Sequence, residues 1–407
     1  MIRPLIGGGS SECKATDENV GKRRCRHLLC ACSSNSLKVI DIINKNNGEA
    51  YLVGGCVRDM VLKEKPHDED LTTSLTPDQV TNIFEKEGYK VIPTGLQHGT
   101  VTVMMDGEGY EITTFRKDST YSDGRHPDSV EFSTDVNDDC SRRDFTFNAM
   151  YYDGKEIIDT YNGQKDIEDK VIRTVGNPDE RFNEDALRML RAIRFSSKLN
   201  FTIAPEVIKS IKKNKSLINK ISKERISSEL TKTLQGPNRI YAIKELQKTG
   251  LLKEIIPEVD NKNLKNKLDL MGRCPSDHQI QFAILFSETD ANDLCRRLKL
   301  SNEDRETIVN LSKHIKKPSC SAEEFIYSNQ DLSDEEFNKL QIIWNDNILK
   351  NTLKRPHRIR DLSVNGDDLI ALGYKGKEVG KQLNKLLKVS IFEHTNNRNK
   401  LLKSLNK

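Results

Sequence analysis

The sequence predicts an α+β N-terminal part followed by an all-helical remainder, and three observations lead to this fold class. Residues 36–176 mix short apolar runs of strand type with segments of helical periodicity. From Asn177 onward the pattern is helical almost throughout, with short Pro and Gly breaks. At 407 residues the chain is also too long for one compact core. We therefore expect several domains.

The stretch YLVGGCVRDMVLKEKPHDEDLTTS at 51–74 contains the densest set of functional side chains. Its apolar start reads as a buried strand that stops at Gly54 and Gly55, and residues 57–62 have helical spacing. Glycines between a strand and a helix N-terminus let the backbone approach a phosphate, whose charge the N–H groups and the helix dipole favour. Arg58 can add a guanidinium fork. This half of the stretch therefore predicts a phosphate-binding turn.

The second half of the stretch contains Asp68 and Asp70. If residues 67–73 form a strand, these carboxylates point to the same face and repel each other unless a cation lies between them. Mg²⁺, an oxygen-ligated ion often shared with substrate phosphates, is the natural candidate. A phosphate-binding turn beside such a pair predicts phosphoryl or nucleotidyl transfer by two metal ions.

Other interpretations of these residues exist. An isolated Asp-x-Asp in a chain with 31% charged residues is more often a solvated edge. His67 followed by Asp68 also suits a histidine–aspartate phosphohydrolase. That chemistry needs further His and Asp ligands, whereas the eight histidines are scattered singly. We therefore set the phosphohydrolase aside.

Further along the N-terminal part, helices are expected at 37–43 and 77–87. Residues 101–105 and 110–115 read as strands joined by a turn of the sequence DGEG, which predicts a hairpin. Glu111 on the second strand is a candidate third carboxylate beside the aspartate pair, although an exposed strand Glu is an equal alternative.

Two charged segments follow in the chain. The polar, turn-rich segment 117–128 is either a surface loop or a mobile active-site loop. SRRDFTFNAM at 141–150 sets Arg142 and Asp144 beside an apolar segment, which in isolation indicates a surface charge cluster.

NEDALRMLRAIRF at 183–195 predicts a helix capped by Asn183, with acidic residues in its first turn. Four charged residues spaced three apart line one slowly drifting face of this helix, and apolar residues on a neighbouring face are expected in the core. The charged residues are Asp185, Arg188, Arg191 and Arg194. The core residues are Leu187, Leu190 and Ile193. A solvated, salt-bridged face is the alternative interpretation.

Composition limits the class and compartment of the protein. Nine cysteines, an odd number, indicate a reducing compartment without a disulfide framework. Cys25, Cys30 and Cys32 lie near His27 but do not fit a zinc spacing. No apolar run is long enough to span a membrane, so we expect no membrane association. Residues 1–35 are expected to be a disordered extension of a cytoplasmic protein. A mitochondrial transit peptide is the alternative, which the acidic residues in this segment disfavour.

Basic residues cluster at 209–225, 354–360 and 375–388, although the net charge is only +4. Basic runs on helices are often simply solvated. Several of them in one helical half also suit the phosphate backbone of an RNA.

These stretches, in their order along the chain, resemble the class II tRNA nucleotidyltransferase (CCA-adding enzyme) and bacterial poly(A) polymerase family. The motifs are GGCVRD with HDEDLTT, GLQHGTVTV…YEITTFR, SRRDFTFNAM, RFNEDALRMLRAIRF and ISKERISSEL. The resemblance covers about 37–230 strongly and the remainder by general helical character. SVNGDDLIALGYKGKEVGKQL at 363–383 is also similar to the tail of bacterial CCA-adding enzymes.

The resemblance implies a head with a DNA polymerase β-like palm, followed by all-α neck, body and tail domains. The implied boundaries are an extension at 1–35, head at 36–176, base-recognition neck at 177–235, body at 236–352 and tRNA-binding tail at 353–407.

The resemblance also implies roles for individual residues. The triphosphate would be held by Gly54, Gly55 and Arg58. The catalytic metal ions would be bound by Asp68 and Asp70, with Glu111 as the third active-site carboxylate. The sugar and phosphate side of the nucleotide would be handled by Arg142 and Asp144. The incoming base would be read by Asp185 and Arg188, with Arg191 and Arg194 near the phosphates. The family usually has an aliphatic residue between the metal aspartates. Here it is Glu69, which is expected to point to the opposite face.

The implied activity is the template-independent addition of CMP, CMP and AMP to the 3′ end of tRNA, with release of pyrophosphate. The implied partners are the acceptor arm and 3′ end of tRNA, CTP, ATP and Mg²⁺, and the sequence leaves open a monomer or a homodimer. A poly(A) polymerase is disfavoured because those enzymes tend to have a more basic segment in place of GLQHGTVTV. A CC-only enzyme is expected to lack the loop at 117–128, which looks complete here. Intact Asp68, Asp70 and Asp185 argue against a non-catalytic tRNA-binding relative.

Overall fold

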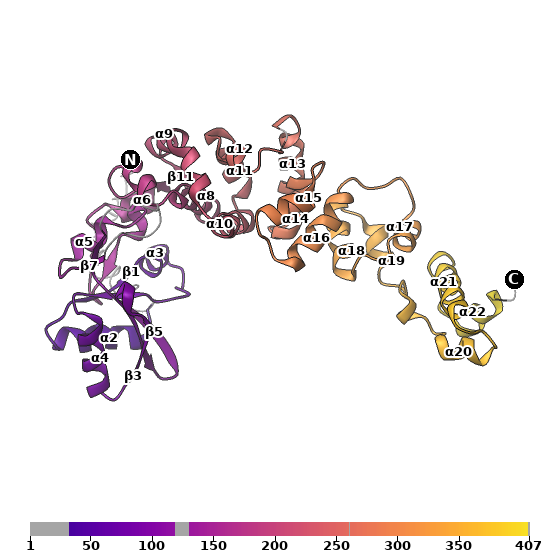
Figure 1. Cartoon of the computed structure of the whole chain (residues 1–407), viewed down its shortest axis with the longest axis horizontal. Coiled ribbons are helices and arrows are strands. Elements are labelled where there is room, and N and C mark those ends of the chain that lie inside the picture. The colour runs from indigo at the N-terminus through magenta and orange to yellow at the C-terminus, as the bar shows by residue number, and fades with distance from the viewer. Residues whose placement is uncertain (1–31, 119–129, 260, 406–407) are drawn as a thin grey trace, which may run out of the picture. The chain divides into compact units, whose positions relative to one another are not determined.

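The structure is a computed structural model that describes residues 32–118, 130–259 and 261–405. It divides into two compact units (Figure 1), Met1–Ala192 with Phe201–Leu217 and Ile193–Asn200 with Ile218–Lys407. The first unit mixes helices with a sheet and the second is helical. The predicted fold class, α+β followed by all-α, is therefore confirmed.

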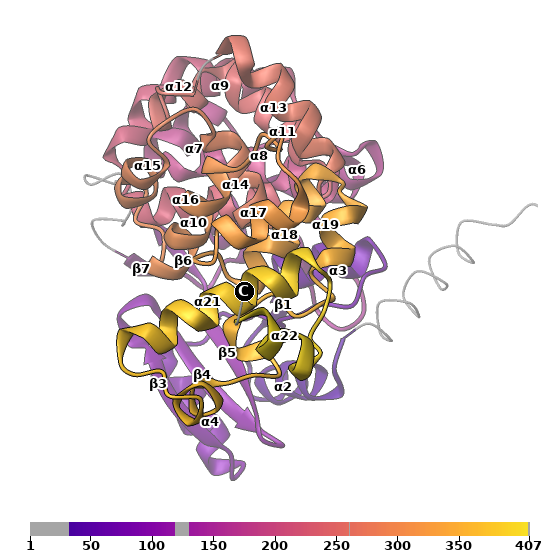
Figure 2. The same cartoon turned by 90° about the vertical axis from the view of Figure 1, so that its right-hand side faces the viewer.

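A seven-stranded mixed sheet forms the centre of the first unit, in the order β3-β4-β5-β2-β1-β8-β9. All neighbours in this sheet are antiparallel except β2 and β5, which run parallel. Figure 2 shows β3, β4 and β5 side by side. Short pairs β6–β7 and β10–β11 lie outside this sheet. The strands are β1 (Ala50–Val53), β2 (Leu71–Thr73), β3 (Lys90–Gly95), β4 (Thr100–Met105), β5 (Glu108–Thr114), β6 (Arg116–Asp118), β7 (Val130–Phe132), β8 (Tyr151–Tyr152), β9 (Ile157–Ile158), β10 (Val171–Ile172) and β11 (Thr202–Ile203).

Helices α2 and α4 of the first unit pack on the seven-stranded sheet. On α2, Val39 and Ile43 are fully buried, and this helix packs against β1. A capping box of Thr76 and Gln79 starts α4, which packs against β3 and β4. These two helices confirm the helices expected at 37–43 and 77–87. The helices are α2 (Ser34–Lys45), α3 (Gly55–Val61), α4 (Pro77–Lys86), α5 (Val136–Ser141), α6 (Gly163–Asp169), α7 (Pro178–Glu184) and α9 (Pro205–Asn214), and α8 (Leu187–Leu199) belongs partly to each unit.

The predicted hairpin is confirmed as β4 and β5. Its turn is made by Asp106 and Gly107, both with positive φ, of 51° and 86°. Such a turn matches the right-handed twist of the flanking strands. The resulting register pairs Thr102 with Glu111, and so fixes the position of Glu111 along the sheet.

The strand expected at 67–73 is shorter than predicted, because β2 begins only at Leu71. Asp68 and Asp70 therefore lie in the segment that leads into the strand. The carbonyl oxygen of Asp70 still accepts a hydrogen bond from the Val53 N–H, at 3.0 Å. Buried Pro66, which has no N–H to donate to a ladder, precedes this segment.

The single helix expected over 183–195 is also wrong, because the chain forms two helices that separate at Asp185. The first, α7, starts earlier than predicted, where the Asn177 side chain caps it and Pro178 occupies its first turn. Asp185 is extended, with φ −141° and ψ 104°, and α8 begins at Leu187. Asn183 is consequently inside a helix rather than at its cap. The predicted core positions on α8 are confirmed, with exposures of 6%, 1% and 0% for Leu187, Leu190 and Ile193.

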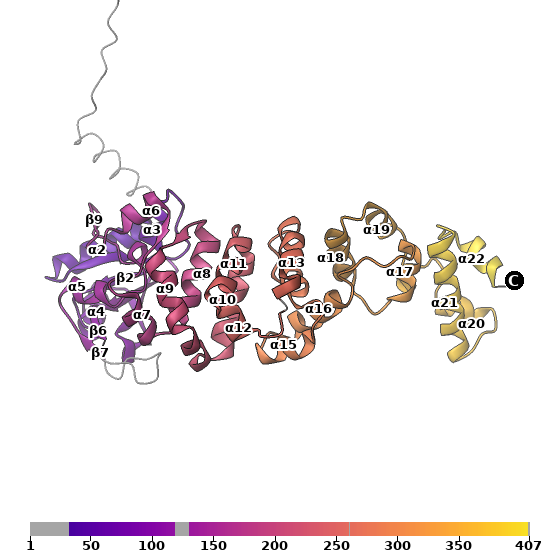
Figure 3. The same ribbon diagram turned by 90° about the horizontal axis from the view of Figure 1, so that it is seen from above.

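From 218 onward, every regular element within the described residues is a helix (Figure 3). Among the described residues, none of the helices combines the length and apolar character that crossing a bilayer requires. The helices are α10 (Lys223–Gln235), α11 (Arg239–Thr249), α12 (Leu251–Ile255), α13 (Asn261–Arg273), α14 (His278–Phe286), α15 (Ala291–Arg297), α16 (Asn302–Lys313), α17 (Ala322–Ser328), α18 (Asp334–Trp344), α19 (Asn347–Thr352), α20 (Gly366–Ala371), α21 (Lys377–Phe392) and α22 (Arg398–Ser404).

Candidate active site

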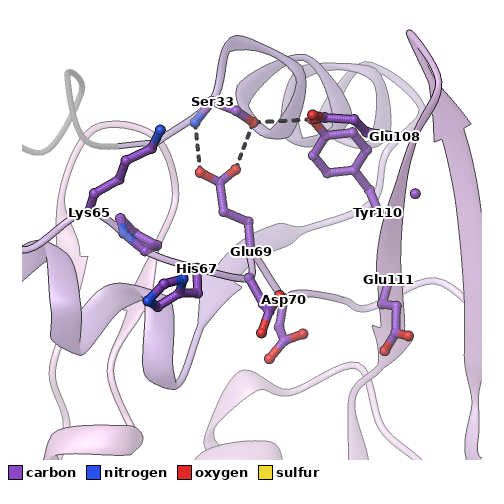
Figure 4. A pocket seen from close by; sticks show the side chains of 11 residues that line it. Ser33, Lys65, His67, Glu69, Asp70, Glu108, Tyr110 and Glu111 are labelled. Carbon is purple, nitrogen blue, oxygen red and sulfur yellow. Dashed lines mark hydrogen bonds between the residues drawn. The ribbon is translucent and has the colours of Figure 1, made fainter. Parts of the chain in front are cut away.

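The predicted carboxylates come together where β2 and β5 run parallel. Leu71 pairs with Ile112, so Asp70, immediately before β2, lies next to Glu111 on β5. In Figure 4 these two side chains point to the same side, while Glu69 points to the other. Asp68, Asp70 and Glu111 all line one open pocket of about 680 Å³.

The carboxylates affect one another electrostatically. Asp70 remains accessible to solvent. Its pKa is nevertheless raised above the usual value, first because the surrounding protein partly desolvates the carboxylate and second because of the negative charge of Glu111. Asp68 adds to this effect, and the Arg143 guanidinium opposes it. The repulsion means that a cation bound between these groups would be stabilised.

The donor set fits a hard divalent cation. All donors are carboxylate oxygens, and Mg²⁺ is usually held by one or two carboxylates together with water and substrate phosphates. Among the described residues, no group of at least three His, Cys, Asp or Glu side chains is already arranged to hold a metal ion. The carboxylates therefore fit a cation whose remaining ligands come from the substrate and water.

The predicted phosphate-binding turn lies between β1 and α3. Gly54 has φ +76°, which other residues rarely adopt, and a β-carbon there would lie 3.4 Å from Arg143 Nη1. Arg58 is only 4% exposed, with Nε donating to Asp59 at 2.8 Å and Nη1 to Asn148 Oδ1 at 2.9 Å. The guanidinium of Arg143 therefore lies beside Gly54, and that of Arg58 lies beside Gly55.

A buried polar cluster orients the two arginines of SRRDFTFNAM. Asp139 is fully buried and accepts from Arg142 Nε at 2.9 Å and from Arg143 Nη2 at 2.8 Å. Tyr151 accepts from Arg143 Nε at 2.7 Å and donates to Asp139 at 2.5 Å. Burial disfavours the charge on Asp139, but Arg143 and Arg142 hold the pKa of this carboxyl well below its usual range.

Arg143 is the functional candidate that the sequence reasoning missed. Its guanidinium acts on Asp70 and lies beside Gly54, whereas Arg142, the residue selected from the motif, is bonded to Asp139. The adjacent pair of arginines was the available signal, but the sequence does not say which of them faces the carboxylates.

Asp144 of the motif SRRDFTFNAM contacts Arg191 of the motif RFNEDALRMLRAIRF, on α8. Asp144 is 9% exposed and accepts from Arg191 Nε at 2.7 Å and from the amide of Asn148 at 3.2 Å. Burial works to raise the pKa of Asp144, but Arg191 and Arg188 hold it below its usual value. Arg188 Nη2 also donates to the Arg142 carbonyl at 2.8 Å.

Asp185 lies at the turn between α7 and α8. One of its carboxylate oxygens accepts the Leu187 N–H at 2.9 Å, which satisfies a donor of the first turn of α8. Arg188, one turn along, is ion-paired with Glu184. The candidate base-reading pair is therefore placed by the break between the helices.

Arg194 makes its contacts within the second unit. Its Nε lies 2.7 Å from Glu229 Oε2, and its guanidinium lies over the Phe195 ring, 4.1 Å from the ring centre. The described contacts of Arg194 thus contribute to the packing of α8 on α10.

The basic cluster at 354–360 is largely engaged within the second unit. Arg358 Nε donates to Asp334 at 2.8 Å and its Nη1 to the Gln330 carbonyl at 2.9 Å. His357 is buried, and exposed Arg360 also pairs with Asp334. These cations hold α18 in place. Residues 1–31, with Cys25, Cys30 and His27, and most of the loop at 117–128 lie outside the described residues.

Comparisons with known proteins match both parts of the chain. The family described as "Poly A polymerase head domain" matches residues 50–173, and the one described as "Probable RNA and SrmB- binding site of polymerase A" matches 200–263. The CCA-adding enzyme of Ligilactobacillus salivarius is 38% identical over 391 residues, 90% of this chain and 94% of that enzyme. That of Bacillus subtilis is 45% identical over 222 residues, 54% of this chain and 55% of that enzyme.

A solved structure agrees with these sequence matches. The crystal structure of the Bacillus stearothermophilus CCA-adding enzyme in complex with CTP is similar with a TM-score of 0.74 and 29% identity. The similarity covers 91% of this chain and 96% of that one. The family that the motifs resemble is thus confirmed, and the chain belongs to the class II CCA-adding enzymes, a family of nucleotidyltransferases.

Proposed function

We propose that this chain adds cytidylate, cytidylate and adenylate to the 3′ end of tRNA from CTP and ATP and releases pyrophosphate. The observation that carries the proposal is the placement of Asp70 beside Glu111 and in one pocket with Asp68. The Asp70 carbonyl also accepts from the Val53 N–H, immediately before the Gly54 turn. The relatives named CCA-adding enzymes, one of them solved with CTP, support the choice of substrates.

Asp68 and Asp70 would hold the divalent metal ions, with Glu111 as the third carboxylate. Bound there, Mg²⁺ would activate the attacking 3′-hydroxyl and stabilise the leaving group, as in two-metal transferases. The chain supplies the negative site, and the repulsion between Asp70 and Glu111 favours the bound cation over the empty pocket.

The triphosphate would lie against Gly54, Gly55 and the guanidiniums of Arg58 and Arg143. The glycines allow close approach of an anion, and the buried Asp59 and Asp139 fix the direction of the arginines. Arg142 and Asp144 would support the nucleotide site indirectly. Asp144 orients Arg191, and the Arg142 carbonyl accepts from Arg188.

The base would be read by Asp185 and Arg188. Cytosine and adenine both offer an exocyclic amino donor beside a ring-nitrogen acceptor, which suit a carboxylate acceptor and a guanidinium donor. Uracil and guanine present a carbonyl oxygen to the carboxylate instead. Each group left unpaired in a buried site costs roughly 1–3 kcal/mol. Two fixed side chains could therefore replace a nucleic-acid template.

Replacing Asp185 by Asn is expected to relax base choice without loss of stability. Asn caps a helix about as well as Asp, so the bond to the Leu187 N–H is kept. The exchange places an amide N–H₂ donor where a carboxylate oxygen would accept from the base. We expect the preference for CTP over UTP to fall by roughly 10-fold or more, the equivalent of one unpaired group. The measurement is single-nucleotide incorporation with each of the four triphosphates.

The matched comparison is Asp185→Ala, which removes both the acceptor and the cap. It is expected to lose selectivity to a similar extent and to cost about 1 kcal/mol of helix stability in addition. If Asp185→Asn keeps the selectivity of the native protein while tRNA binding is unchanged, Asp185 does not read the base.

The activity itself is tested with end-labelled tRNA that lacks its CCA end, incubated with protein and Mg²⁺. CTP alone should give two additions, and CTP with ATP a clean stop at three. A long ladder with ATP alone would identify a poly(A) polymerase, and a stop at two with both nucleotides a CC-only enzyme. Binding of tRNA without any incorporation would reject catalysis.

A further inference from the structure

Glu69, the residue between the two metal-binding aspartates, is tied to the start of α2. Its carboxylate accepts from the Ser33 N–H at 2.8 Å, from the Ser33 hydroxyl at 2.7 Å and from the Ser36 hydroxyl. Ser33 is also the N-cap of this helix, where a negative charge is favoured by the helix dipole. Figure 4 shows Glu69 directed at Ser33, away from the side where Asp70 and Glu111 point.

Ser33 also contacts β5, the strand that contains Glu111. The Ser33 hydroxyl lies 3.5 Å from the hydroxyl of Tyr110, the residue immediately before Glu111. Tyr110 in turn donates to Glu108 at 3.0 Å. The start of α2 therefore connects, from behind, the segment of Asp68 and Asp70 with the strand of Glu111.

This connection matters because the aspartates precede the regular part of β2. The strand begins at Leu71, so its ladder does not extend over Asp68 and Glu69. A metal site needs its ligands held to within a fraction of an ångström, by supports that lock their side chains. The bonds of Glu69 to α2 supply such a support one residue from each aspartate.

We propose that Glu69 is a positioning residue which, through Ser33 and Ser36, fixes Asp68 and Asp70 relative to Glu111. The proposal rests on the metal-binding role assigned above to these carboxylates. Glu69, Ser33 and Ser36 together form a polar clamp between this segment and the start of α2. A leucine at position 69 would remove the acceptor that the Ser33 N–H uses.

The test compares Glu69→Leu with Glu69→Gln and with the control Glu64→Leu. Glu64 is an exposed residue of the same connection between α3 and β2, so the control makes the identical substitution away from the clamp. Gln keeps a carbonyl oxygen that can accept from the Ser33 N–H. Mn²⁺ affinity is measured by electron paramagnetic resonance without tRNA or nucleotide, and kcat and KM for CTP are measured with Mg²⁺.

Glu69→Leu is expected to weaken Mn²⁺ binding and lower kcat by roughly 10-fold or more, as loss of a supporting residue behind metal ligands does. The KM for CTP should change little, because the glycine turn and its arginines are not touched. Glu69→Gln should recover most of both losses, and Glu64→Leu should resemble the native protein. A thermal unfolding curve for each variant verifies that the fold is intact.

A double-mutant cycle tests whether the serine acts through Glu69. Ser33→Ala alone should weaken Mn²⁺ binding, whereas adding it to Glu69→Leu should have little further effect, because residues of one network do not act additively. Should Glu69→Leu bind Mn²⁺ as tightly as the native protein, the proposal is overturned even if nucleotide is incorporated normally. Failure of the native protein to incorporate nucleotide, with the Mn²⁺ effect present, would reject the proposed function and leave the positioning role standing.

Discussion

Replacing Asp70 by Asn should strongly reduce nucleotide incorporation while leaving the fold intact. The carboxylate is one of the proposed metal ligands, and a metal ion contributes several kcal/mol to the transition state, so kcat should fall by roughly 1,000-fold. Incorporation into tRNA lacking its CCA end, at saturating CTP, measures this directly. Native-like activity of the variant would remove Asp70 from the metal site.

The same variant should be no less stable than the native protein when divalent ions are absent. The pKa of Asp70 is raised in the folded state, so its charge destabilises the fold at pH values above that raised pKa. The neutral amide removes this repulsion with Glu111. The control is Asp106→Asn at the tip of the β4–β5 hairpin, where the positive φ of 51° suits Asn equally well. It removes one charge without touching the pocket and should retain full activity.

Replacing Asp139 by Ala should cost about 3–5 kcal/mol of unfolding free energy, the usual effect of removing one partner from a buried ion pair. Asp139 is fully buried, and its loss leaves Arg142, Arg143 and the Tyr151 hydroxyl without their shared acceptor. Urea unfolding gives the free-energy difference. Activity of the fraction that stays folded should also fall, because Arg143 is no longer held beside Gly54.

The matched control is Asp41→Ala on α2. Asp41 forms an exposed ion pair with Lys45, which is worth about 0.5 kcal/mol at most. Equal destabilisation by the two substitutions would show that burial of Asp139 does not matter.

The Asp139 cluster also predicts a pH dependence of stability. Because the pKa of Asp139 is lowered in the folded state, its contribution is fully present above the ordinary Asp value of about 3.9. The contribution is lost as the pH falls through the depressed folded value, where the folded protein takes up the proton. Asp139→Asn should therefore show a shallower loss of stability below about pH 4 than the native protein. Parallel acid-unfolding curves would contradict this assignment.

Local sequence determined the elements whose causes lie within a few residues. The hairpin follows from Asp106 and Gly107, which can adopt the left-handed conformation that its turn needs. The strand before Gly54 and the helix after it follow from apolar spacing. The family motifs identified the residue types of the site for the same reason, since each motif is a short continuous segment.

Tertiary structure decided the features that depend on contacts between distant segments. The break at Asp185 was missed because the periodic pattern runs through it, whereas Asn177 and Pro178 set an earlier start for α7. The pairing of Asp144 with Arg191 joins residues 47 positions apart.

Most site features that the sequence did not predict concern the contacts of charged side chains. A sequence shows that Arg142, Arg143 and Glu69 are charged, but not which groups face them once the chain has folded. Arg143 rather than Arg142 lies beside Gly54, and Glu69 is bound by Ser33 from a helix 36 residues earlier. The sequence by itself determined the fold class, the elements with local causes and the residue types of the candidate site. Only the tertiary structure decided which charges meet, because electrostatic pairing depends on distance through space and not on separation along the chain.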